Sequence, residues 1–429
     1  MLDQSPSKTS SSHCAFSTMR LPANPSTDTI RQRFLHSIRD ACSEWMGQEQ
    51  LEKKSSCDGG IQLNPDQNVA KFMSLLVNAL RADLPPAVTF ALDGLSFSVW
   101  KQGVAYPNDI LLPVTSVVPS TSTTAWSSIL SGTLPSEHGI LGAAFLVSAA
   151  EGCYSLRHSI RYSADIAVPC TFNEPLIYFT NANLFATLKD LGYACQYRGQ
   201  PRYATESRFL RDLAYCADLI PLENADHLHF SPCELVEEII KQTRTALTST
   251  ERPLYQFNMV NFDSYVHCHG YDDSLFEALV LLRQEIDSLL RQFPEVCISG
   301  ISDHGMIRQA CRSNKSILSD TSVLQMSRYN PGGAGRILFF YPRPEAYADL
   351  WNLLSERIGN DGILFTRETF LTKYIGSTSE EVASRVGDIV AIAQTDAFPS
   401  ALPSALFEHG GLSTDEMMAG MCFFGAPEK

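Results

Sequence analysis

The stretch VVPSTSTTAWSSILSGTLPSEHGI, residues 117–140, places four consecutive hydroxyl side chains, residues 120–123, directly before a helical pattern. Pro119 prevents an earlier helix start, and apolar residues recur at helical spacing over residues 125–130. A hydroxyl at a helix N-terminus lies among free backbone N–H groups at the positive end of the helix dipole, where a phosphate can bind. Ser and Thr are also the preferred N-cap residues, so this stretch on its own favours an ordinary helix cap.

The composition is that of a large folded protein with an acidic surface. The chain has 429 residues, of which 44% are hydrophobic and 19% charged, so there is ample material for a buried core. Its net charge of −14 argues against a nucleic-acid duplex or an anionic membrane surface as the main partner. A phosphorylated small-molecule substrate stays compatible with this charge, because metal ions can supply positive charge locally.

The cysteine usage and the N-terminal sequence lead us to expect a cytoplasmic protein. The twelve cysteines form no CxxC pairs, which indicates reduced, mostly buried thiols rather than a secreted disulfide scaffold. No apolar run approaches the roughly 20 residues of a transmembrane helix. Residues 1–28 are rich in Ser, Pro and Thr without the apolar segment of a signal peptide, and we expect them to form a disordered tail.

Strands and helices alternate along the rest of the chain, which predicts an α/β fold with a mainly parallel central sheet flanked by helices. Residues 29–84 are expected to form a helical N-terminal extension, which either packs on the core or mediates association; the oligomeric state stays open. Residues 85–429 are expected to form the main domain. Two irregular segments, at about 143–255 and 306–385, are predicted to be cap insertions on the substrate side.

Acidic residues and histidines follow three of the predicted strands, at residues 87–94, 255–263 and 295–305. These residues are Asp93 after the first strand, Asp263, His267 and His269 after the second, and Asp303 and His304 after the third, joined by His409 from a glycine-rich loop. The carboxyl ends of parallel strands lie at one edge of a sheet, so residues remote in sequence should converge there. A set of Asp and His without Cys suits zinc, and also manganese or iron.

Such a set can perform phosphoryl transfer. Two metal ions about 3.5–4 Å apart can clamp the attacking and leaving oxygens, and a hydroxyl at the adjacent helix start can serve as the nucleophile. One acidic turn, or one histidine, is more often structural, but three such turns beside a hydroxyl-rich helix start favour a site. His138 lies well along from the hydroxyl run and is expected to hold loop structure. Four arginines are weaker candidates for substrate contact, since each is more often a surface charge: Arg161, Arg198, Arg202 and Arg336.

The order of these motifs resembles the alkaline phosphatase superfamily, in its type I phosphodiesterase/nucleotide pyrophosphatase branch. The matching pieces extend over about residues 85–425 and are FALDG at 90–94, PSTSTTAWSSILSGTLPSEHGILG at 119–142, DSYVHCHG at 263–270, SDHGM at 302–306 and EHGGLSTDEM at 408–417. The resemblance implies an alkaline-phosphatase-like catalytic core with cap insertions. It also implies two divalent metal ions, most commonly Zn²⁺, with Mn²⁺ or Fe as alternatives.

Carried over position by position, the resemblance implies two sets of metal ligands. One ion would bind Asp263, His267 and His409, and the other would bind Asp93, Asp303, His304 and the nucleophile. In the family the nucleophilic Ser or Thr lies ten residues before the glycine of the helix segment. Counting back from Gly132 gives Ser122, with Thr121 as the alternative.

The function implied by the resemblance is a metal-dependent hydrolase of small-molecule phosphate esters, acting through a phosphoseryl intermediate. Ala143 stands where this branch usually has an Asn that contacts a phosphate oxygen, and Ser122 replaces the more usual Thr. Both departures count against specificity for nucleotide diesters, though not against hydrolysis itself. The alternatives are a phosphomonoesterase or phosphonate hydrolase with the same site, a group transferase, or a non-catalytic binding protein of the same fold.

Overall fold

The structure is a computed structural model. It describes residues 27–46, 66–104, 106, 108–148, 152–155, 160–163, 166–169, 183–199, 208–222, 231–249, 253–310 and 316–425. Most of the expected N-terminal tail, residues 1–26, lies outside the described residues, whereas Thr27 and Asp28 already belong to a helix. None of the described helices is long and apolar enough to span a membrane.

A seven-stranded sheet lies at the centre of the fold. In spatial order its strands are β2 (Ile110–Thr115), β17 (Met418–Phe423), β10 (Cys297–Ile301), β1 (Ala87–Asp93), β9 (Leu254–Asn261), β7 (Ala194–Gly199) and β8 (Asp218–Pro221). The five strands from β10 to β8 pair in parallel, while β17 runs antiparallel between β10 and β2. The predicted α/β fold with a mainly parallel central sheet is therefore confirmed.

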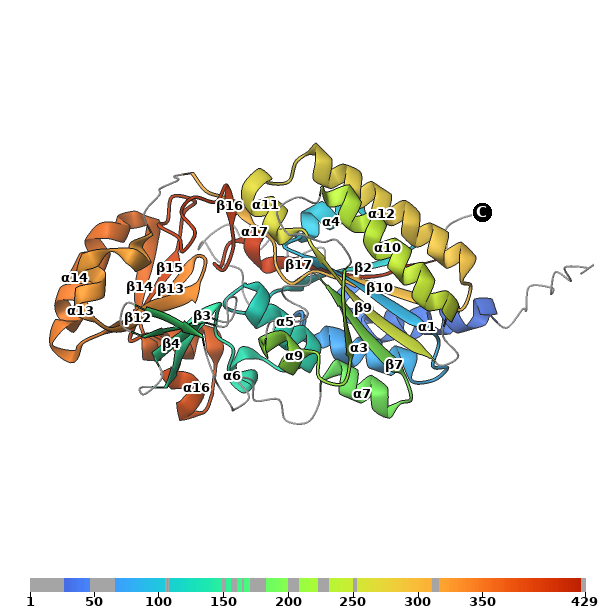
Figure 1. The fold of residues 1–429 in the computed structure, drawn as a ribbon, viewed down its shortest axis with the longest axis horizontal. Coiled ribbons are helices and arrows are strands. Elements are labelled where there is room, and N and C mark those ends of the chain that lie inside the picture. Colours follow the sequence, from blue (N-terminus) through green and yellow to red (C-terminus); the bar gives the residue numbers. More distant parts are fainter. Residues whose placement is uncertain are drawn as a thin grey trace, which may run out of the picture.

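Helices cover both faces of this sheet (Figure 1). One face carries α4 (Phe97–Gly103), α10 (Pro232–Ser249) and α12 (Asp273–Gln292), and the other carries α3 (Lys71–Leu80), α5 (Ser122–Ser131), α7 (Leu184–Asp190) and α9 (Arg208–Leu213). In β1, Val88 and Phe90 join the hydrophobic core under α10 and α12, whereas Ala87 and Ala91 join the core on the other face. Burial on both faces explains why this strand reads as a continuous apolar run.

A second sheet of eight strands lies beside the central one (Figure 1). All its neighbouring strands pair antiparallel, in the order β14 (Gly362–Thr366), β15 (Ile389–Ala393), β13 (Ile337–Pro342), β12 (Ser327–Ala334), β3 (Ala144–Ser148), β4 (Gly152–Ser155), β5 (Ile160–Ser163) and β6 (Ile166–Pro169). The pairing of Gly333 with Ala144 joins the strands of the two expected insertions into one sheet. Helices α13 (Thr321–Met326), α14 (Tyr347–Ile358), α15 (Arg367–Phe370) and α16 (Glu380–Ser384) accompany this sheet.

The extent of the two insertions differs from what the sequence analysis expected. Strands β7 and β8 come from within residues 143–255, yet they belong to the central sheet. The second insertion runs past residue 385, because β15 pairs with β13 and β14. The sequence ACQYRG of β7 carries Gln and Arg between its apolar residues, so no continuous apolar run marks this strand.

The N-terminal helices pack on the core. The Arg31 guanidinium of α1 (Thr27–Ala41) donates hydrogen bonds to the carbonyls of Leu290, Pro294 and Val296 at 2.8–3.2 Å. The ring of Phe34 meets that of Phe423 in β17 edge to face. Of the two roles left open for residues 29–84, the described part of the segment serves the first, which is packing against the domain. A short helix, α2 (Ser43–Met46), follows α1.

Candidate active site

Three neighbouring strands of the central sheet bring three aspartates to one edge. Asp93 is the last residue of β1, Asp263 begins α11 (Asp263–His269) after β9, and Asp303 follows β10. Because β10, β1 and β9 are parallel and adjacent, their carboxyl ends lie side by side. The N–H of Gly94 donates to Asp303 Oδ1 at 3.0 Å, which ties the first turn to the third.

Ser122 is the first residue of α5 and faces this edge. Its Oγ donates to Asp93 Oδ1 at 3.2 Å and lies 3.2 Å from His304 Nε2. Thr121, the other candidate nucleophile, is the buried, extended N-cap residue, and its side chain makes no capping hydrogen bond. Of the two hydroxyls, the structure gives that of Ser122 the hydrogen bond to the aspartate.

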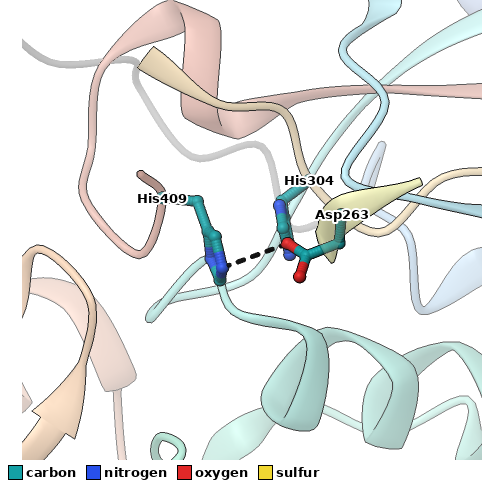
Figure 2. A group of neighbouring side chains, drawn as sticks. All are labelled: Asp263, His304 and His409. Carbon is teal, nitrogen blue, oxygen red and sulfur yellow. Dashed lines mark ion pairs between the residues drawn. The ribbon is translucent and has the colours of Figure 1, made fainter. Parts of the chain in front are cut away.

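Two histidines from different segments converge on Asp263. His267 lies one turn along α11, and its Nε2 is 3.4 Å from Asp263 Oδ1. His409 follows β16 (Phe407–Glu408), and its Nε2 is also 3.4 Å from Asp263 Oδ1. Figure 2 shows His409 beside Asp263 and His304, and the rings of His304 and His409 stack at a centroid distance of 3.9 Å.

The backbone fixes the orientation of these three imidazoles. Each Nδ1 lies within hydrogen-bond distance of a carbonyl oxygen: His267 with Phe407 at 2.8 Å, His304 with Gly305 at 3.1 Å, and His409 with Ser120 at 3.1 Å. A carbonyl only accepts, so each Nδ1 carries the proton and each Nε2 presents its lone pair to the site, as in metal-binding histidines. His269 is exposed and stacks on Tyr265 instead.

The spacing of the inward-facing atoms fits metal ligation. Ligand atoms around a tetrahedral zinc ion lie about 3.3 Å apart, given Zn–N and Zn–O bonds of roughly 2.0–2.1 Å. Asp303 Oδ2 and His304 Nε2 are 3.1 Å apart. Three groups of described residues have spacing that could hold an ion: Asp93 with Asp303 and His304, Asp263 with His304 and His409, and His267 with Glu408 and His409. The group of Asp93, Asp303 and His304 is one of the two expected ligand sets without Ser122. The other expected set, Asp263, His267 and His409, is divided between the remaining two groups.

The electrostatics of the site also favour a cation. Burial, reinforced by the neighbouring Asp303 and Asp263, raises the pKa of Asp93 well above its usual value. Burial likewise raises the pKa of Asp303 to about 7. Burial lowers the pKa of His409 well below its usual value, which keeps this imidazole neutral. Buried carboxylates this close together require a compensating positive charge to stay ionised near neutral pH.

Comparison with known proteins identifies the family of this chain. A family profile described as type I phosphodiesterase / nucleotide pyrophosphatase matches residues 88–401, which is well over half of the chain. The chain belongs to this family. It is thereby a member of the alkaline phosphatase superfamily, as its motifs indicated, and its family indicates a phosphate-ester hydrolase. No curated protein sequence matches the chain.

Solved structures share the fold of this phosphodiesterase-family chain. Murine ectonucleotide pyrophosphatase/phosphodiesterase 5 is similar with a TM-score of 0.56 and 16% identity over 79% of this chain and 88% of that one. An inactive threonine-to-alanine variant of the murine protein, in complex with AMP, gives a TM-score of 0.55 and 16% identity over 80% and 88% of the two chains. The human counterpart gives 0.53 and 14% identity over 79% and 88%.

Two residues that the sequence analysis did not single out lie at the same edge of the sheet. The hydroxyl of Tyr271 donates to Gly94 O at 2.9 Å and accepts from Met306 N at 3.0 Å, so it holds the turn after β1 against the turn after β10. Glu408 is fully buried next to His409. Tyr271 directly follows the motif at 263–270 and Glu408 is the first residue of the motif at 408–417, yet neither belongs to a periodic pattern that would have revealed its role.

The loop that carries His409 is held by a buried ion pair. Arg336 Nε donates to Glu416 Oε1 at 3.0 Å, and the Arg336 backbone N–H donates to His409 O at 3.0 Å. Glu416 is the third residue of the short helix α17 (Thr414–Met417), whose N-cap residue is Ser413. Arg336 is thus structural in this chain, and Arg198 bonds Gln196 and Gln242. Arg202 and the side chain of Arg161 lie outside the described residues.

His138 has the structural role that was expected of it. It ends the short helix α6 (Pro135–His138), is fully buried, and lies 2.8 Å from Ser128 Oγ through Nε2. Its Nδ1 accepts from the N–H of Ile140 at 3.1 Å, so Nε2 carries the proton and donates to Ser128. Burial lowers the pKa of His138 to about 3. The imidazole therefore cannot act as a base toward Ser128.

We expect His138→Ala to reduce stability without removing catalysis. The substitution leaves Ser128 Oγ and the Ile140 N–H unpaired and opens a cavity, which should lower the free energy of unfolding by about 2–5 kcal/mol. Urea denaturation measures this loss, and Ser128→Ala is the control that removes only one of the two hydrogen bonds. In the folded variant, turnover should stay within about threefold of wild type. A folded variant without activity would contradict the structural role.

Proposed function

We propose that the protein is a hydrolase of small-molecule phosphate esters that uses two divalent metal ions, most commonly Zn²⁺, and a phosphoseryl intermediate on Ser122. The observation that carries the proposal is the position of Ser122 Oγ at the N-terminus of α5, 3.2 Å from both Asp93 Oδ1 and His304 Nε2. A hydroxyl at the N-terminus of a helix, among carboxylate and imidazole groups, suits attack on a phosphorus atom.

The proposed ligand sets are Asp263, His267 and His409 for one ion, and Asp93, Asp303 and His304 with Ser122 for the other. When bound, such ions would supply Lewis acidity that lowers the pKa of oxygen nucleophiles and offsets negative charge at the phosphoryl group. The neutral imidazoles and their carbonyl partners keep the Nε2 atoms turned inward for this purpose.

The chain's own groups account for the positioning of the substrate. The first hydrogen bond of α5 runs from Ala125 N to Thr121 O at 2.9 Å, so the N–H groups of residues 122–124 precede the intrahelical ladder. These groups suit phosphoryl oxygens. Ser122 Oγ would attack phosphorus, forming the O–P bond as the bond to the leaving alcohol oxygen breaks. Water would then cleave the phosphoserine, releasing the phosphate product and restoring the hydroxyl.

The nature of the ester is the finer part of the proposal. The inactive threonine-to-alanine variant of the murine relative was solved with AMP, which supports a small phosphorylated ligand and a required hydroxyl. The family match supports diesters as the first choice. Ala143 supports the second candidate, a phosphomonoesterase or phosphonate hydrolase, because its side chain cannot bind a phosphate oxygen and its N–H already donates to Gly333 O.

A substrate panel tests this proposal. Initial rates are measured for bis-p-nitrophenyl phosphate, p-nitrophenyl phosphate and p-nitrophenyl phenylphosphonate, with zinc and with manganese. We expect the diester to exceed the monoester by at least about tenfold in kcat/KM, which corresponds to roughly 1.4 kcal/mol of transition-state binding. A higher kcat/KM for the monoester would favour a phosphomonoesterase. Transfer of the phosphoryl group to an added alcohol would reveal a transferase. Absence of turnover with every ester and both metals would leave a binding protein.

A further inference from the structure

Glu408 is a buried carboxylate whose bonding is incomplete. It ends β16, directly before His409, and only 1% of its surface is exposed. Its Oε1 accepts a hydrogen bond from the backbone N–H of His409 at 3.0 Å. Its Oε2 has no hydrogen-bond partner in the part of the chain that the structure describes. A buried carboxylate oxygen without a partner is costly, which calls for a compensating group.

The surroundings of Glu408 belong to the metal-ligand cluster. Its Oε1 lies 3.8 Å from His409 Nε2 and 4.0 Å from His267 Nδ1, and the three residues have the spacing of a group that could hold an ion. Both histidines already direct Nδ1 to backbone carbonyls. Glu408 is therefore not needed to set their tautomers, and what it adds beside them is a carboxylate.

No arginine or lysine neutralises Glu408 among the described ion pairs, in which its partners are the two histidines. Arg336, whose backbone bonds to His409, directs its guanidinium to Glu416 instead. The turn between β12 and β13 closes over Glu408, since a Cβ on Gly335 would lie 2.9 Å from Oε1. The carboxylate is thus enclosed against the site rather than turned to solvent.

A count of charges indicates what Glu408 does. The proposed set of Asp263, His267 and His409 holds one carboxylate, and the other set holds two, so three negative charges would face two divalent cations. Glu408 supplies the fourth. We infer that Glu408 is the fourth carboxylate of the metal centre and strengthens binding of the ion at Asp263, His267 and His409. The inference rests on the proposed function, and it adds a residue to the inferred ligand set.

The test compares zinc binding by the wild type and Glu408→Gln. Glutamine keeps the shape of the side chain and the Oε1 acceptor for the His409 N–H but removes the charge. Competition with a chromophoric chelator gives the two zinc affinities. We expect one zinc to bind about 10–100-fold more weakly in Glu408→Gln, with the other unchanged. The Tm of the metal-free variant should equal or exceed that of the metal-free wild type, because a buried carboxylate has been removed.

Glu416→Gln is the matched control, because Glu416 is an equally buried acid in the nearby helix α17 that is paired with Arg336, Gly411 and Ser413. It should lower the Tm of the metal-free protein. Zinc affinities of Glu408→Gln within twofold of wild type would overturn the inference while leaving the proposed function intact. A metal-free Tm that falls as in Glu416→Gln would also overturn it, by assigning Glu408 a structural role. A wild type that binds neither zinc nor manganese would instead refute the metal-dependent function itself.

Discussion

Replacing Ser122 with alanine should lower phosphate-ester turnover by at least about 10⁴-fold, since loss of a covalent nucleophile leaves only the contributions of binding and electrostatics. The zinc content should stay near that of the wild type, because Asp93, Asp303 and His304 remain in place. Ser122 is partly exposed at the first helical position, so the fold should tolerate the change. The measurements are kcat with the preferred ester and metal analysis of the purified variant.

Thr121→Val is the control for this experiment. It removes a hydroxyl one residue away, and the Thr121 side chain makes no capping hydrogen bond that would be lost. We expect its turnover to stay within about tenfold of wild type, as is usual for a site-adjacent change that spares the reacting group. If Thr121→Val is inactive and Ser122→Ala active, the nucleophile is Thr121. Acid-quenched wild type should carry phosphate on Ser122, which peptide mass spectrometry can locate.

The central strands that were predictable share one physical property. Strands β1, β9 and β10 are largely buried on both faces and end in a polar turn; β1 and β10 read as apolar runs, whereas β9 keeps Gln256 and Asn258 among its apolar residues. Strand β2 was not predicted, because Pro113 interrupts its pattern; the structure places it at the edge of the sheet, where proline is tolerated. The four-residue β8 has a half-exposed pattern that does not distinguish it from a loop.

The same reasoning explains which site residues were found. Asp93, Asp263 and Asp303 follow adjacent parallel strands, so a rule about sheet edges brings them together before any coordinates are known. Tyr271 and Glu408 act through contacts between loops that are far apart in sequence, such as the bond from Met306 N to Tyr271. No local pattern encodes such contacts. The roles of the converging residues as metal ligands and nucleophile stay predictions that the experiments above address.

Removing the metal ions should also cause a large loss of phosphate-ester turnover. Dialysis against a chelator is expected to lower turnover by at least about 10³-fold, because the charge that develops at phosphorus would lose its main stabilisation. Zinc should restore activity, and manganese is the comparison ion. Activity that survives complete metal removal, verified by elemental analysis, would contradict a metal-dependent mechanism. Ser122→Ala should regain its metals under the same conditions without regaining turnover, which separates loss of the ions from loss of the nucleophile.

Metal removal should also make stability depend on pH. In the metal-free protein, burial raises the pKa of Asp303 to about 7 and that of Asp93 well above its usual value. An aspartate in the unfolded chain titrates near pH 3.9, so between about pH 4 and 7 the folded state binds more protons than the unfolded state. These two aspartates therefore make the free energy of unfolding fall as pH rises through this window, and the lowered pKa values of His138 and His409 oppose them only below about pH 6.5. The Tm of the metal-free protein should be higher at pH 5.5 than at pH 8, and zinc should raise the Tm at pH 8 most. Equal metal-free Tm values at the two pH values would mean that the aspartates are not held together in the buried cluster on which the proposed site depends.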